Sequence, residues 1–146
     1  MAALANLREH SSCILFASAG VTVIQQRRIT ANIPAWALEA IEAWWEHYAG
    51  FDWYHINIDR NAGTPFVHMT MNFTAPITPR HMLECEVVLK NRGSSSVTHR
   101  VVGYPNKVLC FEGEFVSVFV NAKEMTPRTP PPDILFATER AGIDTT

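Results

Sequence analysis

The clearest helical pattern in the chain runs from Pro34 to Ala49. Apolar side chains dominate it, and glutamates recur at helical spacing on one narrow stripe, at positions 39, 42 and 46. Asn32 can cap the first turn, Pro34 suits a first-turn position that needs no N–H donor, and Gly50 suits the stop. A helix with so narrow a polar stripe is expected to be wrapped by other structure.

Most of the remaining chain alternates apolar and polar residues, which is typical of half-buried strands. The alternation is clearest between Val67 and Phe73. Short turns separate these segments, so the strands are expected to pair antiparallel, and Gly113 is a candidate bulge. A long apolar helix followed by such strands predicts an α+β fold in which a sheet curls around the helix. The predicted strands cover residues 67–73, 83–90, 95–104 and 108–120.

Composition is that of one ordinary globular domain. The chain has 146 residues, of which 47% are hydrophobic and 18% charged, enough to bury a core. Its net charge of −2 offers no basic face for phosphates, which argues against nucleic acid as a partner. No apolar run approaches the ~20 residues of a membrane span, so no membrane partner is expected. Three widely spaced cysteines, Cys13, Cys85 and Cys110, predict neither disulfides nor a metal site and fit a reducing cytoplasm.

A series of short motifs closely resembles the 4-hydroxybenzoyl-CoA thioesterase family of hotdog proteins. The motifs follow the family's order, with similar loop lengths, from Ile29 to about Val120. They are Ala31–Trp36, Trp44–Glu46, Gly50–Tyr54, Gly63–Met69, Asn72–Ile77 and Asn91–Val97. The resemblance implies a hotdog fold over 29–146, an antiparallel sheet wrapped around one long central helix. Its Pro-rich end, at 126–132, is predicted to be extended and then to fray.

The resemblance also implies hydrolysis of a small acyl-CoA thioester, with coenzyme A as part of the substrate and no separate cofactor. An aromatic or branched acyl group would suit the aromatic-rich helix. Family members form homodimers whose sheets join edge to edge, often paired into homotetramers, with the active site at the dimer interface. A carboxylate in an Asp-x-Asp-Pro-Ala-Gly-like loop acts as nucleophile or general base, and a backbone N–H near the helix N-terminus polarises the thioester carbonyl.

Transferred to this chain, the catalytic acid is missing. The family's acid lies nine positions before an asparagine like Asn32, which places it at Val23 and the polarising amide near Thr30. Valine cannot ionise or exchange a proton. Residues 1–28 are therefore an atypical N-terminal segment.

The other candidate residues each have a structural alternative. Thr64 is expected to line the acyl pocket or to be a turn residue. His68 is expected to orient the acyl group or water, or to be a hydrogen-bonded structural histidine. Arg92 lies where relatives carry basic residues for the phosphates of coenzyme A, with Ser94 and Ser95 beside it, but a lone arginine is usually just solvated.

Three explanations account for the missing acid. The chain is an acyl-CoA or acyl-carrier binding protein without activity, or a divergent enzyme that uses Glu39 or Glu42, or residues up to about 28 are translated from a shifted reading frame. The third is favoured, because Val21–Gln26 can be encoded so that the shifted frame reads Asp-Cys-Asp-Pro-Ala, with the second Asp at position 23. It predicts that the first strand is poorly packed or disordered.

Overall fold

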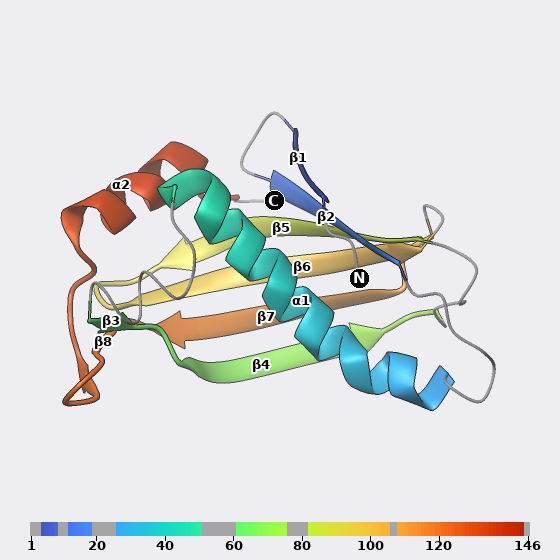
Figure 1. Cartoon of the computed structure of the whole chain (residues 1–146), viewed down its shortest axis with the longest axis horizontal. Coiled ribbons are helices and arrows are strands. Elements are labelled where there is room, and N and C mark those ends of the chain that lie inside the picture. The colour runs from blue at the N-terminus through green and yellow to red at the C-terminus, as the bar shows by residue number, and fades with distance from the viewer. Residues whose placement is uncertain are drawn as a thin grey trace.

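The computed structural model describes residues 4–8, 12–18, 26–50, 61–75, 82–105 and 108–144. Within them, six antiparallel strands form the main sheet in the order β1-β2-β5-β6-β7-β4, and a small sheet has the order β3-β8-β9. One long helix, α1 (Gln26–Ala49), lies across one face of the main sheet (Figure 1). The strands are β1 (Leu4–Arg8), β2 (Ser12–Ser18), β3 (Ala62–Gly63), β4 (Phe66–Phe73), β5 (Met82–Arg92), β6 (Ser96–Pro105), β7 (Phe111–Val118), β8 (Val120–Asn121) and β9 (Thr126–Pro127). This is the predicted α+β hotdog arrangement.

The long helix begins eight residues earlier than its sequence pattern predicts. Pro34 lies inside α1, which starts at Gln26, so Asn32 is not its cap. A proline inside a helix removes one backbone hydrogen bond, a cost that packing has to offset. Ile33, directly before the proline, is buried in the core, so the packed part of α1 includes residues on the N-terminal side of Pro34. The predicted end is confirmed, because Gly50 has φ 81° and donates its N–H to Glu46.

The period-two pattern locates the central strands correctly. β4, β5 and β6 lie within two residues of their predicted bounds, whereas β7 starts three residues late, at Phe111. The predicted bulge at Gly113 is wrong, since its pairing with both neighbours is regular. A Cβ at Gly113 would lie 2.6 Å from the Thr70 carbonyl oxygen, so this glycine permits a close strand contact instead. The register shifts fall between Phe66 and His68 and between Leu89 and Asn91.

The core lies between α1 and the sheet face that it covers. Trp44 and Trp45 are its largest buried side chains and meet edge to face, with ring centroids 4.8 Å apart. Alternate residues of β5, β6 and β7 complete the core from the sheet. They are Leu83, Cys85, Val87, Leu89, Val97, His99, Val101, Phe111 and Phe115.

The C-terminal segment is a helix rather than an extended tail. α2 (Pro132–Ala141) starts with a proline at its first position and buries Ile134, Ala137, Thr138 and Ala141. The Arg140 guanidinium donates to the His47 carbonyl oxygen at 3.2 Å, so α2 is fastened to the C-terminal end of α1. The sequence prediction failed because most of this helix's stability comes from tertiary contacts.

The N-terminal segment pairs with the sheet through its backbone. β2 is opposite β5 over seven residues, with Leu15 opposite Cys85, and β1 pairs with β2. Residues 19–25, including Val23, lie outside the described part of the chain. The reading-frame hypothesis and the poorly packed first strand therefore stay predictions.

Candidate functional site

β4 is an edge strand of the main sheet and carries the predicted site residue His68, and Thr64 lies two residues before its start. One side of it pairs with β7, and no described strand pairs with the other. Its apolar side chains Val67, Met69 and Phe73 are 61%, 51% and 51% exposed. An exposed edge with apolar side chains is a template for pairing with a second chain.

Thr64 lies directly before β4 and is 1% exposed. Its hydroxyl has no hydrogen-bond partner among the described residues. The hydroxyl of an exposed turn residue would be hydrated, whereas the hydroxyl of Thr64 is shielded from water. A buried hydroxyl without a partner costs roughly 1–3 kcal/mol, which a ligand or water could offset.

His68 is exposed, and its position in the register is opposite Val116 of β7. Val116 lies at an outward-facing position of β7, whose buried residues alternate with it. His68 therefore occupies the sheet face that α1 does not cover. In the described part of the chain, no hydrogen-bond partner supports either role predicted for His68.

Arg92 fastens α2 to the sheet. Its Nη1 donates to Thr138 Oγ1 at 2.8 Å and to the Leu135 carbonyl oxygen at 3.5 Å, and lies 3.7 Å from Glu139. The guanidinium is thus neither freely solvated nor presented to a phosphate by itself. Ser94, in the turn that follows, is exposed.

Ser95 contributes its backbone to the same end of the sheet. The Ser95 carbonyl oxygen accepts the N–H of Phe119 at 2.6 Å, just after the end of β7. The Pro65 carbonyl oxygen, next to Thr64, accepts the N–H of Val118 at 3.0 Å. Thr64 and the turn after β5 therefore flank the same end of β7.

Thr30 lies at the opposite end of the molecule. It is in the second turn of α1, where a helical residue donates its N–H to the carbonyl one turn earlier. The C-terminal end of α1 is fastened to α2, which Arg92 connects to the turn after β5. At 1.5 Å per residue, Thr30 lies roughly 30 Å along the helix from that end. The two ends of α1 lie toward opposite ends of the main sheet (Figure 1). The predicted site residues therefore fall into two groups at opposite ends of one chain.

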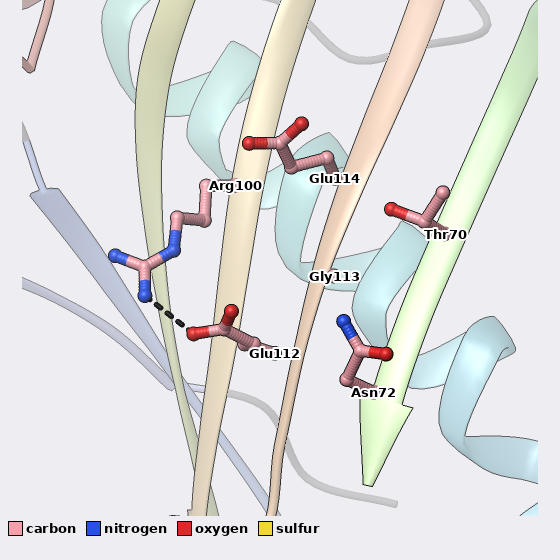
Figure 2. Close-up of a pocket in the computed structure, with 6 residues that line it drawn as sticks. All are labelled: Thr70, Asn72, Arg100, Glu112, Gly113 and Glu114. Carbon is pink, nitrogen blue, oxygen red and sulfur yellow. Dashed lines mark hydrogen bonds and ion pairs between the residues drawn. The ribbon is translucent and has the colours of Figure 1, made fainter.

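A polar hollow on the uncovered sheet face was not predicted from the sequence. It has a volume of about 230 Å³ and lies over β4, β6 and β7 (Figure 2). Arg100 turns toward Glu112, with 2.6 Å between Nη2 and Oε2, and this hydrogen bond raises the pKa of Arg100. The lining residues are Thr70, Asn72, Arg100, Glu112, Gly113 and Glu114. These residues occupy the polar positions of the alternating strands, which is the sequence feature that could have indicated the hollow. The same feature is also typical of a sheet face exposed to solvent.

The buried cysteines have raised thiol pKa values. Burial is the main cause for Cys85, with smaller effects from Cys110, Glu84 and Glu39, and it raises the pKa to about 12. Burial raises the pKa of Cys110 to about 11, and its Sγ donates to the Ala75 carbonyl oxygen at 3.1 Å. Neither thiol is prepared as a nucleophile. Within the described residues, no cluster of side chains could hold a metal ion.

The structure has close relatives among known proteins. It resembles that of a thioesterase superfamily protein from Jannaschia sp. CCS1, with 37% sequence identity over 97% of this chain and 100% of the other, and a TM-score of 0.80. No protein-family model and no curated protein matches the sequence.

More distant structures share the fold. A 1,4-dihydroxy-2-naphthoyl-CoA thioesterase from Synechocystis is 15% identical, covers 86% of this chain and 94% of its own, and has a TM-score of 0.67. A gentisyl-coenzyme A thioesterase is 20% identical, with 82% and 88% coverage and a TM-score of 0.64. No described helix is long and apolar enough to cross a membrane.

Proposed function

This chain belongs to the thioesterase superfamily, and on that premise we propose that it binds acyl thioesters of coenzyme A and hydrolyses them. The observation that carries the proposal is the 37% identity with a thioesterase superfamily protein over nearly all of both chains. Identity at this level along the whole length supports a common site as well as a common fold.

A site shared between two copies would reunite the two groups of candidate residues. In one chain, Thr64 and Arg92 lie at one end of the sheet and Thr30 lies at the other. An antiparallel pairing of two β4 edges places unlike ends of the two sheets side by side. The Thr64 end of one copy would then approach the α1 N-terminus of its partner. This agrees with the homodimer that the family resemblance implies.

The acyl group is proposed to be small, with an aromatic group as the first candidate. Two of the structural neighbours are named for aromatic acyl-CoA substrates, although their identity of 20% or less supports only the fold. The exposed side chains of Met69 and Phe73 offer apolar surface near the proposed shared site.

A thioester-binding protein without hydrolysis is the second candidate. Valine at position 23 favours this candidate, because valine cannot replace a catalytic carboxylate. A carboxylate that activates water as a general base typically contributes about 10²–10⁴-fold to the rate. The choice between the two functions thus depends on whether an acid is supplied at position 23 or by a helix glutamate.

Release of coenzyme A from a panel of small acyl-CoA thioesters, measured by chromatography, tests the proposal. Val23→Asp is the test variant, and Val23→Asn is the matched control with similar shape and no ionisable group. We expect Val23→Asp to raise kcat/KM about 10²–10⁴-fold above Val23→Asn. Glu39→Gln and Glu42→Gln are made in the unaltered chain, and if one of these glutamates serves as the acid, its substitution alone would abolish the residual hydrolysis.

Binding of a non-hydrolysable thioether analogue, measured by calorimetry, separates the two candidates. Binding without hydrolysis in any variant selects the binding protein. If no variant hydrolyses a thioester and no analogue binds, both functions are excluded.

A further inference from the structure

A histidine and two tryptophans form a closed aromatic cluster between α1 and the sheet. His99 of β6 has an exposure of 0%, and Trp44 and Trp45 of α1 have 0% and 1%. The centroid of the His99 ring lies 4.5 Å from that of Trp44 and 5.6 Å from that of Trp45, edge to face in both cases. The imidazole is therefore one of the surfaces on which the C-terminal half of α1 rests.

The imidazole has no polar partner in this cluster. Neither Nδ1 nor Nε2 of His99 has a hydrogen-bond partner among the described residues, and the indole nitrogens of Trp44 and Trp45 have none either. In the sheet register, His99 is opposite Leu89 of β5 and Phe115 of β7, which are both apolar and buried. Among the described residues, no acceptor is in place for a second ring proton.

Charged and titratable groups lie elsewhere on the packed elements. The Tyr48 ring of α1 packs against Trp44, with ring centroids 4.9 Å apart, and the Arg140 guanidinium lies over the Tyr48 ring. The other groups occupy exposed or half-buried positions. Among the described side chains they are Glu39, Glu42, Glu46 and His47 on α1, Glu84, Glu86, Lys90 and Arg92 on β5, Arg100 and Tyr104 on β6, and Glu112 and Glu114 on β7. The one buried group besides His99 on the described part of these elements is the thiol of Cys85 on β5, and burial raises its pKa to about 12, so it is neutral. Burial alone acts on the imidazole and lowers its pKa to about 3.

A neutral imidazole is tolerated in such a place, but an imidazolium is not. Transfer of an unpaired charge from water into an apolar interior is strongly unfavourable even after relaxation. The ring can therefore take up a proton only where water reaches it. Since α1 closes the cluster on one side and the continuous sheet on the other, departure of the helix is the direct way to admit water.

We propose that His99 is an acid-sensitive latch, so that uptake of one proton by its ring releases α1 from the sheet. Because the proposed thioester site includes the N-terminal end of α1, release would also dismantle that site. The latch itself does not depend on the proposed function, as it concerns packing alone.

Urea unfolding of the full chain between pH 7.5 and pH 4.5 tests the latch against a His99→Phe variant. A histidine with a lowered pKa binds its proton more readily when unfolded, so its contribution to stability is lost as the pH falls below about 6.5. The loss continues down to the folded pKa of about 3. The ratio of unfolding constants, wild type over His99→Phe, is therefore expected to rise about a hundredfold between pH 7.5 and pH 4.5. Parallel pH profiles for the two proteins would overturn the proposal.

Two further measurements keep the test decisive. His68→Gln removes an exposed histidine and should leave the pH profile of the wild type unchanged. Hydrogen exchange at pH 4.5, corrected for the intrinsic rate, should show that α1 amides lose protection before those of β5 and β6. If His99→Phe fails to fold, an NMR titration of wild-type His99 decides. A ring that titrates near pH 6.5 in the folded state contradicts the latch.

Discussion

Gly103 of β6 is a position where one added methyl group should strongly destabilise the fold. A Cβ built there lies within 2.6 Å of three carbons of the Phe111 ring. Ordinary carbon contacts are about 3.5–4.0 Å, so the ring would have to move by about 1 Å or more. Phe111 is fully buried in the core and has little room to do so. The Phe111 ring can therefore occupy its position only because residue 103 has no Cβ atom.

We expect Gly103→Ala to lower the free energy of unfolding by about 3 kcal/mol. Overpacking of a core typically costs about 1–3 kcal/mol, and expulsion of the ring would approach the roughly 3–5 kcal/mol of Phe→Ala. For a chain of this length, that lowers Tm by about 6–12 °C. Urea unfolding followed by circular dichroism, at one fixed protein concentration, measures the change.

The control and the rescue test the proposed cause. A Cβ at Gly93 meets only the mobile end of Ser96, so Gly93→Ala should cost less than about 1 kcal/mol. Phe111→Leu removes part of the ring, so the double variant Gly103→Ala/Phe111→Leu should be at least about 1 kcal/mol more stable than the sum of the single changes predicts. Strict additivity would refute the steric argument.

Three more predictions concern groups whose role the structure changes. Arg92→Met should lower the free energy of unfolding by about 1–2 kcal/mol by loosening α2, with no change in KM for a thioester; a large rise in KM would instead support phosphate binding. Thr64→Val should raise Tm slightly if its hydroxyl stays without a partner, and should raise KM if the acyl group contacts it. In a Cys13→Ser variant, Cys85 and Cys110 should react with a thiol reagent at pH 8 only after unfolding, because burial raises both pKa values.

The central sheet could be predicted from the sequence because its signal is local. In β4 and β5 apolar and polar residues alternate along the sequence, so the bounds of these strands were nearly correct. Burial follows this alternation along most of β5, whereas the apolar side chains of the edge strand β4 are exposed. The start of α1 could not be predicted in the same way. Pro34 looks like a first-turn residue, yet α1 already begins at Gln26, and Ile33, on the N-terminal side of the proline, is buried in the core.

α2 depended on contacts that no local pattern reveals. Its Thr138 meets Arg92, and its Arg140 meets the carbonyl of His47, all distant in sequence. For the same reason Arg92 looked like a free cation. The arrangement of the site could not be predicted either, because Thr64 and Thr30 lie at opposite ends of one chain. A second copy would be needed to bring such residues together.

The source of a catalytic acid can be narrowed further from the described carboxylates. Each of them is exposed or half-buried, and none lies in the core. Glu112 and Glu114 occupy the sheet face away from α1, and Glu112 is already paired with Arg100. Glu39 and Glu42 are on the exposed stripe of α1, so each would need cover from another surface, such as that of a second copy, to be shielded from water. Of the two sources of an acid that the sequence analysis names, a helix glutamate would need such cover, whereas the segment before α1 would need a carboxylate at position 23, and Val23→Asp tests this second source directly.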